Sequence, residues 1–456
     1  MSSYDFTKGS INKKLTMFML PILLSLFLQQ LYGAVDVWVV GNFSTSADLS
    51  AVSNGYQFIS IFINFVAGLS VGTTIILGNK IGAKDTFDLG KVIGASIYIF
   101  LLVSLIFTFS IGLNGDLFAG LINAPTEAFD KTSSYISILG YGSLFLVSYN
   151  ILGAIFRGLG DSKTPLFAVA VATVVNIGLD LLFVKGFGLG AYGASIATVI
   201  AQGVSVIFSL IVIFKRKTNF TFKMSYIRYS KKYTKSIIAL GMPLALNSFL
   251  VTLSFTFVLR ITNGLGVNVS AGVGVTERLI GFLMLIPMAF GSAMGAFTAQ
   301  NVGASLHDRA KKGLYFSIIC SISIALIVAV FTLLFGQNML RIFSDDAAVI
   351  EPGYEYLKAY CFDIFFTAIL FNALGYFNGY SKTAFTMVNG IIGAFAFRVP
   401  LSYLFSLITP VSIFLIGLAT PSGTLFQIIL CIIWYILLQK KLKKEKGKIT
   451  PNKIGL

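Results

Sequence analysis

Two aspartates lie deep inside long apolar stretches of the chain. Asp36 stands in LYGAVDVWVVG and Asp180 in NIGLDLLF, and a carboxylate inside a bilayer costs at least a few kcal/mol. Asn176 precedes Asp180 by one helical turn, so both side chains project from one face of a helix. Thr198 follows in GASIATVIAQ. Together these residues offer two carboxylates, an amide oxygen and a hydroxyl.

This set of oxygens predicts a cation site. Hard oxygen ligands suit a small hard cation such as Na⁺, and two close carboxylates in a low dielectric also suit a shared proton, because like charges resist joint ionisation. The alternative is that each aspartate only caps or pairs locally. The matching positions in the second half are near Val258 and Ser402, neither acidic, which favours a specialised ion site in the first half. We expect no metal beyond Na⁺ and no cofactor.

The second half of the chain has polar residues of its own within apolar sequence. Asp363 is a candidate for contacting a cationic substrate or a second ion, and Arg398 is expected to pair with Asp363 or with backbone carbonyls. Glu277 and Arg278 are neighbours near a predicted helix end, where long charged side chains can reach the interface. We interpret that pair as structural.

The elements that must position these residues are membrane spans. Mean hydropathy is +0.85, apolar residues make up 56% of the chain and charged residues only 11%, which excludes a soluble protein of this length. Apolar runs long enough to cross a bilayer predict an all-α membrane protein with twelve transmembrane helices. Their ranges are 15–40, 50–77, 91–113, 130–155, 164–184, 189–214, 236–262, 270–297, 313–335, 352–376, 384–408 and 413–438.

Basic residues set the orientation of these spans. Most of the 34 Lys and Arg residues fall in the tails and in alternate loops, and the positive-inside rule puts that side in the cytoplasm. Both termini are therefore predicted to be cytoplasmic, with the protein in the plasma (inner) membrane. The same placement speaks against nucleic-acid binding despite the net charge of +16. The longest basic loop, 215–235, is either a patch for anionic lipid or a plain connector.

The two halves of the chain repeat each other. NKIGAKD at 79–85 matches QNVGASLHD at 300–308, and FRGLGDSKT at 156–164 matches YFNGYSKT at 376–383. Six spans per half is an even number, so both halves start on one side of the membrane. We predict two six-helix lobes related by a pseudo-two-fold axis along the membrane normal, as in many secondary transporters. The predicted domains are an N-terminal lobe (1–214), a basic connector (215–235), a C-terminal lobe (236–438) and a basic tail (439–456).

Two prolines occupy matching places near the start of the first span in each half, Pro21 and Pro243. A proline inside a helix removes one backbone hydrogen bond and bends the helix. Each is therefore either a hinge for alternating access or a fixed kink.

The order of motifs resembles the multidrug and toxic compound extrusion (MATE) family of secondary exporters over nearly the whole chain. The motifs are VDVWVVG, NKIGAKD, FRGLGDSKTP, VNIGLDLLFVKGFGLGAYGASIAT, QNVGA and FRVPLSYLF. The resemblance implies antiport of organic cations against Na⁺ or H⁺, with Asp36, Asn176, Asp180 and Thr198 as the cation site of the first lobe. Some members carry an acidic residue early in the seventh span, whereas residues 247–251 here are not acidic.

The sequence therefore predicts an antiporter that exports amphipathic, often cationic compounds (multidrug efflux), acting as a monomer in the lipid bilayer. One rival is a flippase for a lipid-linked precursor, although such proteins more often have fourteen spans and a basic cavity. Another is an ion channel. An intramembrane enzyme is not expected, because the chain has no HExxH or GxSxG motif and no histidine within a span.

Overall fold

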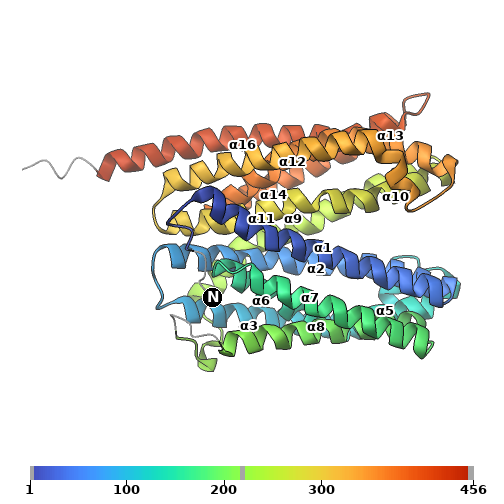
Figure 1. Ribbon diagram of the computed structural model, residues 1–456, viewed down its shortest axis with the longest axis horizontal. Coiled ribbons are helices and arrows are strands. Elements are labelled where there is room, and N and C mark those ends of the chain that lie inside the picture. Colours follow the sequence, from blue (N-terminus) through green and yellow to red (C-terminus); the bar gives the residue numbers. More distant parts are fainter. Residues whose placement is uncertain (1–4, 216–220, 450–456) are drawn as a thin grey trace, which may run out of the picture. The chain divides into compact units, whose positions relative to one another are not determined.

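The computed structural model describes residues 5–215 and 221–449, and all the regular structure in these ranges is helical (Figure 1). Residues 216–220 of the predicted connector and 450–456 of the predicted tail lie outside the described residues. The helices of the first half are α1 (Ile11–Phe43), α2 (Ser46–Gly82), α3 (Leu89–Phe107), η1 (Thr108–Gly112), α4 (Gly115–Leu121), η2 (Thr126–Ala128), α5 (Phe129–Tyr141), α6 (Ser143–Gly158), α7 (Lys163–Asp180), η3 (Leu181–Gly186) and α8 (Gly190–Lys215).

The second half continues in the same way. Its helices are η4 (Met224–Tyr226), α9 (Lys231–Asn263), α10 (Val267–Leu283), α11 (Leu285–Gly303), α12 (His307–Arg341), α13 (Ala347–Gly379), α14 (Thr383–Ile391), η5 (Ile392–Arg398), α15 (Val399–Ser406) and α16 (Ile413–Ile449). In the described part of the chain, 11 helical segments are long and apolar enough to cross a membrane, and one bent pair supplies a twelfth. The predicted all-α membrane fold is confirmed.

The fourth span, predicted over 130–155, is bent where α5 meets α6. α5 and α6 meet at an angle of 52°. Gly140 lies so close to the backbone of Gly112 that a Cβ there would overlap it, and glycine is a poor helix former. The Ser143 hydroxyl bonds to the Ser104 carbonyl (2.9 Å) and contacts Thr108 Oγ1 (2.8 Å) on the neighbouring span. These contacts with a neighbour stabilise the break.

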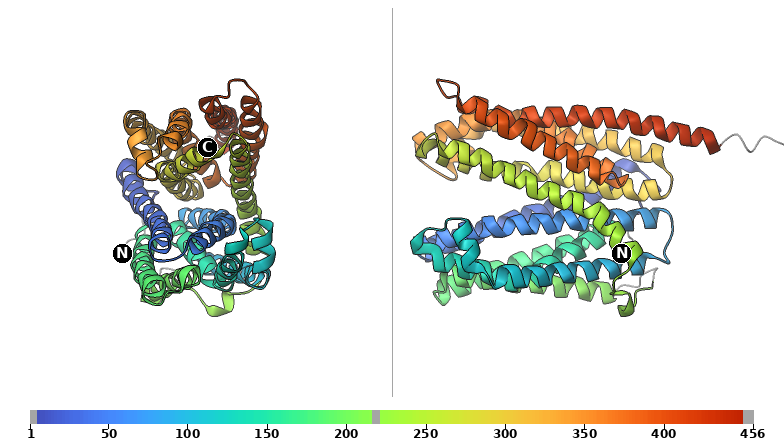
Figure 2. Two further views of the ribbon diagram at one scale, coloured as in Figure 1. Left: turned by 90° about the vertical axis from the view of Figure 1, so that its right-hand side faces the viewer. Right: turned by 180° about the vertical axis from the view of Figure 1, so that it is seen from behind.

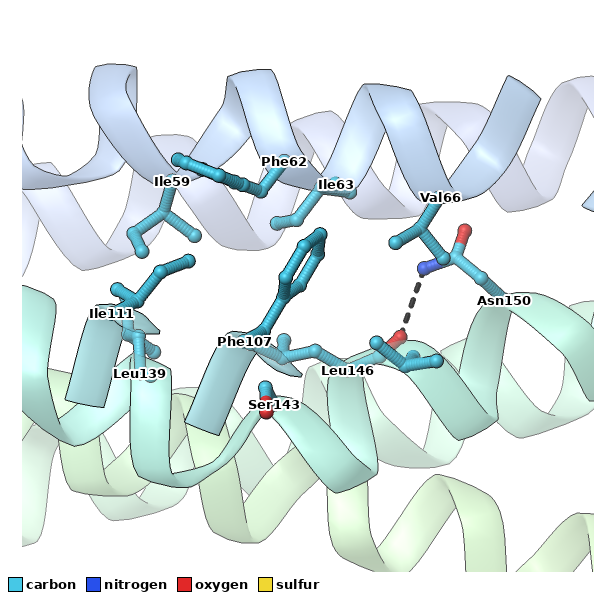
Figure 3. Close-up of a pocket in the computed structure, with 12 residues that line it drawn as sticks. Ile59, Phe62, Ile63, Val66, Phe107, Ile111, Leu139, Ser143, Leu146 and Asn150 are labelled. Atoms are coloured by element: carbon cyan, nitrogen blue, oxygen red, sulfur yellow. Dashed lines mark hydrogen bonds between the residues drawn. The ribbon is translucent and has the colours of Figure 1, made fainter. Parts of the chain in front are cut away.

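An apolar pocket lies beside this bend (Figure 3). Aliphatic and aromatic side chains of α2, the α3–η1 span, α5 and α6 line it, and Asn150 on its wall donates a hydrogen bond to the Leu146 carbonyl (2.9 Å). The four residues of the predicted cation site do not line this pocket. The lining residues include Ile59, Phe62, Ile63, Val66, Phe107, Ile111, Leu139, Ser143 and Leu146.

Among the described residues, three helical segments have the wider π-helical hydrogen-bonding pattern. η3 begins directly after Asp180, and η5 ends on Arg398; the third, η1, continues α3. Single π-helical turns inside α-helices often occur at functional sites, because they change the direction in which nearby side chains project. Two of the three adjoin a residue singled out from the sequence.

Contacts between Cα atoms divide the chain into two units. Unit 1 holds the described residues up to Thr252 together with Met288–Ser317 and Gly375–Met387. Unit 2 holds Leu253–Pro287, Ile318–Leu374 and the described residues from Val388 onward. The units cut through several helices, because parts of second-half helices pack against the first half. The predicted lobes 1–214 and 236–438 stay a prediction.

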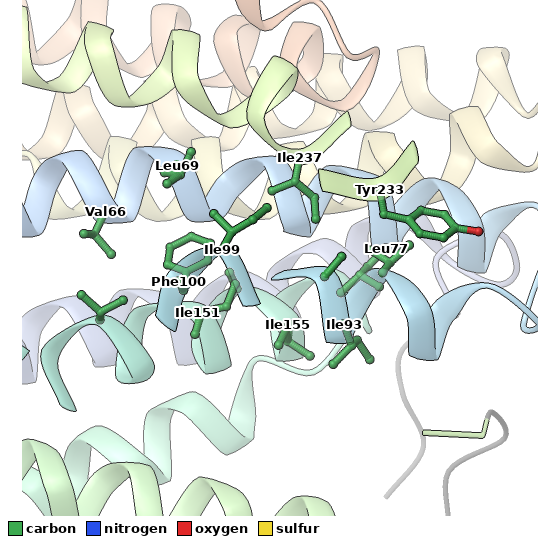
Figure 4. Packing of buried hydrophobic residues seen from close by; sticks show 14 of the residues in the cluster. Val66, Leu69, Leu77, Ile93, Ile99, Phe100, Ile151, Ile155, Tyr233 and Ile237 are labelled. Carbon is green, nitrogen blue, oxygen red and sulfur yellow. The ribbon is translucent and has the colours of Figure 1, made fainter. Parts of the chain in front are cut away.

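In unit 1, α1, α2, α7 and α8 lie side by side (Figures 1 and 2). One apolar core of this unit joins α2, α3 and α6 to the first turns of α9 (Figure 4). Leu69, Phe100 and Ile151 contribute from the first half, and Ile237 contributes from α9. Burial of these side chains fixes the start of α9 against the first half.

A row of glycines on α2 makes close helix contacts in unit 1. A Cβ on Gly68 or Gly72 would come within 2.8 Å of the α9 backbone, and one on Gly78 within 2.8 Å of the Ala299 side chain on α11. A Cβ on Gly82 would overlap the Gln300 carbonyl oxygen. Small residues let membrane helices approach backbone to backbone. We call Gly68, Gly72, Gly78 and Gly82 the α2 glycine row.

Candidate functional site

The predicted cation-site residues come together in unit 1 from α1, α7 and α8. Asp36, Asn176, Asp180 and Thr198 are all buried. The Thr198 hydroxyl donates a hydrogen bond to Asp36 Oδ2 (3.2 Å), and the Asp36 carboxylate also interacts with the side chains of Asp180 and Asn176. The spacing of Asn176 and Asp180 therefore does place both side chains on the face of α7 that meets α1.

Much of the hydrogen-bonding capacity at this site is unused. Asp36 Oδ1, both carboxylate oxygens of Asp180 and both polar atoms of the Asn176 amide are buried, with no hydrogen-bond partner among the residues that the structure describes. An unsatisfied buried polar atom costs about 1–3 kcal/mol, and folded proteins rarely leave them in groups. Four of these atoms are oxygens, so the arrangement suits a bound cation or proton.

Three tyrosines and a glutamine surround the site, and the sequence analysis did not find them. The phenols of Tyr32, Tyr56 and Tyr135 interact electrostatically with Asp36, and Gln202 Nε2 donates to the Tyr32 hydroxyl (3.2 Å). Tyr32 precedes Asp36, and Gln202 follows Thr198, by one helical turn, so helical spacing could have found both. Nothing in the local sequence points to Tyr56 or Tyr135.

Arg398 lies in unit 2, and the contacts that the described residues give it are with Ser254 and Phe255. Its Nη1 donates to Ser254 Oγ (3.0 Å), and its guanidinium lies over the Phe255 ring, 4.1 Å from the centroid. Within the described chain it forms no salt bridge with Asp363, which is buried and bonds to the Thr424 side chain. The two groups still interact electrostatically. A guanidinium can stack on an aromatic face as well as pair with a carboxylate, and here it stacks.

Glu277 belongs to this second cluster and faces the protein, whereas the interpretation of Glu277–Arg278 as a structural pair stays a prediction. The Tyr356 hydroxyl donates to Glu277 Oε1 (2.9 Å), and the Glu277 carboxylate interacts electrostatically with Arg398 and Asp363. The side chain of Arg278 is exposed instead. We call Glu277, Tyr356, Asp363 and Arg398 the unit 2 cluster. Its net charge is −1 when both carboxylates are ionised.

The predicted hinge residues lie inside unbroken helices. Pro21 is in the interior of α1 and Pro243 in that of α9. The Ser25 hydroxyl donates to the Pro21 carbonyl (2.7 Å). The backbone bond that the proline removes would have gone to the carbonyl of Met17, so the Ser25 bond does not replace it. The role of both prolines as hinges stays a prediction.

The described residues contain no group of three or more His, Cys, Asp or Glu side chains that could hold a metal ion. The oxygen donors of the unit 1 site are two carboxylates, one amide and one hydroxyl. Such a set fits a weakly bound monovalent ion better than a tightly held divalent metal.

The MatE family model matches residues 21–182 and, a second time, residues 243–404. The chain belongs to the MatE family. One match falls in each half, so the repeated motifs are two copies of the same family unit. The resemblance to MATE exporters is thereby confirmed, and the chain is a multi-pass membrane protein of this family.

Relatives of this MatE chain extend along most of its length. It is 29% identical over 407 residues to the probable multidrug resistance protein YpnP of Bacillus subtilis (strain 168), covering 89% of this chain and 91% of that protein. It is 25% identical over 378 residues to the multidrug export protein MepA of Staphylococcus saprophyticus, covering 82% of this chain and 81% of that protein.

Solved structures share the fold. A MATE protein in the straight conformation aligns with a TM-score of 0.91 at 21% identity, covering 97% of this chain and 99% of the other. A MATE protein in the bent conformation aligns with a TM-score of 0.91 at 22% identity, covering 98% and 99%. These likenesses concern the arrangement of helices.

Proposed function

We propose that this MatE protein is an antiporter that exports amphipathic organic cations in exchange for Na⁺ or H⁺. The observation that carries the proposal is the group of unsatisfied buried oxygens on Asp36, Asn176 and Asp180. An ion that binds there supplies the missing partner and relieves the repulsion between two buried carboxylates. The site is then most stable when it is loaded.

Coupling requires that the ion binds two conformations with different affinity. Asp36 lies on α1, whereas Asn176 and Asp180 lie on α7, so the distance between the two carboxylates depends on how α1 sits against α7. A bend of α1 at Pro21 changes that distance. Ion entry from outside therefore favours one position of α1, and substrate release follows from the change. The related proteins solved in straight and bent conformations support this step.

The unit 2 cluster supplies the attraction for a cationic substrate. Two carboxylates, Glu277 and Asp363, outweigh the one guanidinium of Arg398. The rings of Tyr356 and Tyr360 lie close together at a tilt of 38° (5.9 Å between centroids). Aromatic rings beside a net negative charge suit a flat organic cation. The multidrug names of YpnP and MepA agree with a site that selects charge and flatness rather than one exact shape.

The rival function is a flippase for a lipid-linked precursor. An anionic pyrophosphate headgroup calls for a basic cavity. Arg398 is the basic residue of the unit 2 cluster, but the two carboxylates near it leave the cluster negative. This charge favours export of cations. We further propose a monomer in the plasma membrane with both termini in the cytoplasm, working without a cofactor.

Ethidium efflux from loaded proteoliposomes tests the proposal. A Na⁺ gradient and a pH gradient are imposed in turn on the wild type, Asp36→Asn, Asp180→Asn and the exposed control Asp345→Asn. We expect one gradient to drive efflux in the wild type and the control, and neither aspartate variant to respond. Wild-type efflux that neither gradient drives contradicts antiport. Normal transport by both site variants contradicts the ion site.

A further inference from the structure

The N-terminal segment before α1 is anchored inside unit 1 by one aromatic side chain. Phe6 is fully buried. Its ring packs edge-on against Phe18 of α1 (4.9 Å between centroids) and against Phe297 of α11 (5.6 Å). Five residues ahead of the first helix, Phe6 thus fills a place between a helix of the first half and a helix of the second.

The backbone around Phe6 is held by side chains about 300 residues away in the sequence. The Phe6 N–H donates to Gln300 Oε1 (3.1 Å). Arg309, in the first turn of α12, donates from Nε to the Phe6 carbonyl (2.7 Å) and from Nη2 to the Lys8 carbonyl (3.0 Å). Hydrogen bonds from a charged donor are stronger than those between neutral groups. The segment Asp5–Ser10 is therefore tied to both α11 and α12.

Gln300 links this segment to the α2 glycine row. Its side chain accepts the bond from Phe6, while its backbone carbonyl lies against Gly82 at the end of α2. Gly303, one turn further along α11, packs in the same way on the Asn79 carbonyl. The segment is therefore bonded to a residue of α11 that lies in close contact with α2.

The segment is also continuous with the part of α1 that precedes Pro21. Phe18 lies one turn before that proline, and it packs directly on Phe6. Residues from Asp5 to Leu20 can thus move together when α1 bends. A change in the bend of α1 then pulls on the contacts of Phe6 with Phe297 and Gln300.

We infer that Asp5–Ser10 is a latch that holds this end of α11 and α12 against α1 and α2, and that it releases when the transporter opens at this end. The inference rests on the alternating access in the proposed function but does not need a particular ion or substrate. The latch sets the fraction of protein molecules that are closed at the end where the segment Asp5–Ser10 lies. Weakening the latch therefore shifts the population toward the state open at that end.

The test measures distances between spin labels on the full-length protein in nanodiscs. The labels are attached to Ala83→Cys, after α2, and Lys312→Cys, on α12, with Cys320, Cys361 and Cys431 replaced by serine. Both label positions are exposed. Phe6→Ala removes the packing of the latch and Arg309→Gln removes its charged hydrogen bonds. Phe6→Leu is the conservative match, and Leu20→Ala removes a half-exposed side chain of α1 outside the latch.

We expect Phe6→Ala and Arg309→Gln each to raise the ratio of long to short distances about tenfold, which is about 1.4 kcal/mol. Phe6→Leu should shift it less, and Leu20→Ala should leave it unchanged. Folded Phe6→Ala and Arg309→Gln proteins with the wild-type distance distribution overturn the latch. If Phe6→Ala does not fold, Arg309→Gln alone decides. If no gradient drives ethidium efflux but the distances still shift, antiport fails and the latch stands.

Discussion

Thr198 on α8 and Asp36 on α1 are joined by a hydrogen bond of 3.2 Å across 162 positions of the sequence. The hydroxyl engages Oδ2 and leaves Oδ1 without a partner in the described part of the chain. One carboxylate oxygen of Asp36 is thus held by Thr198, and the other keeps its hydrogen-bonding capacity. In the antiport that we propose, this bond orients Asp36 toward the ion, and the Thr198 hydroxyl adds an oxygen to the site.

Replacing Thr198 by valine should weaken ion coupling more than it weakens the fold. A hydrogen bond to a charged group contributes about 1.5–3 kcal/mol, so we expect the ion concentration for half-maximal efflux to rise about tenfold or more in Thr198→Val. Thr198→Ser keeps the hydroxyl and should stay close to wild type. Equal loss in both variants, measured in the proteoliposome assay, would mean that packing of the methyl group matters instead.

Neutralising Glu277 should weaken transport of cations. Glu277→Gln keeps the shape of the side chain but leaves the unit 2 cluster neutral, so we expect the KM for ethidium to rise about tenfold. Tyr356→Phe removes the hydrogen bond to Glu277 and should have a smaller effect. Glu351→Gln, at an exposed position of α13, is the matched control. An unchanged KM for Glu277→Gln would show that the unit 2 cluster does not bind the substrate.

The start of α9 is held by Asp88, and this contact should depend on pH. The Tyr233 hydroxyl, together with Lys80 (3.3 Å), Lys91 (3.3 Å) and Lys232 (3.4 Å), holds the pKa of the Asp88 carboxyl well below its usual range, against the opposing effect of burial. A carboxyl whose folded-state pKa is lowered stabilises the fold above its unfolded pKa of about 3.9. This stabilisation is lost as the pH falls through the folded value.

Asp88→Asn should therefore lower the Tm of the detergent-solubilised protein by about 2–4 °C at pH 7. The difference from wild type should shrink as the pH falls below about 4. Lys232→Gln should have a smaller effect, because the Lys232 side chain is 69% exposed and exposed ion pairs contribute little. A difference in Tm that is the same at pH 7 and pH 3 would show that the Asp88 charge is not responsible.

A methyl group on Gly82 should separate α2 from α11. Its Cβ would overlap the Gln300 carbonyl oxygen, which as backbone cannot turn aside. We expect Gly82→Ala to lower the Tm by several degrees and to reduce efflux. In Gly274→Ala, where a Cβ on α10 meets no atom within 4 Å, the Tm should be unchanged or slightly raised, since alanine favours a helix. A Gly82→Ala protein as stable and active as wild type would contradict the close contact.

The cation-site residues could be found from sequence because intramembrane carboxylates are rare and Asn176 and Asp180 repeat with the helical period. The unit 2 cluster was found only in part. Glu277 stands beside Arg278 near a predicted helix end, a pattern typical of interface residues, and only its bond to Tyr356 shows that it faces the protein. A contact between residues 79 positions apart has no local signal.

The spans could be predicted because hydropathy alone is enough to recognise twelve apolar runs in the sequence. The break between α5 and α6 was not, because it depends on Gly140 meeting Gly112 of the third span and on Ser143 bonding to Ser104. Glycines are frequent in membrane helices, so Gly140 and Gly142 alone do not separate a packing site from a break. Tertiary contacts decide between the two.

The α2 glycine row brings peptide groups close to the backbones of α9 and α11, and only Gly78 in this row faces a side chain, the Ala299 methyl group. Glycine has no side-chain torsion angles. The helices can therefore separate and repack without any rotamer change at these positions. When it parts, the newly uncovered surface is rich in peptide groups, which water solvates well. The row can therefore alternate between a packed interface and a hydrated surface. Larger apolar side chains at these positions would expose apolar area to water each time the helices separate.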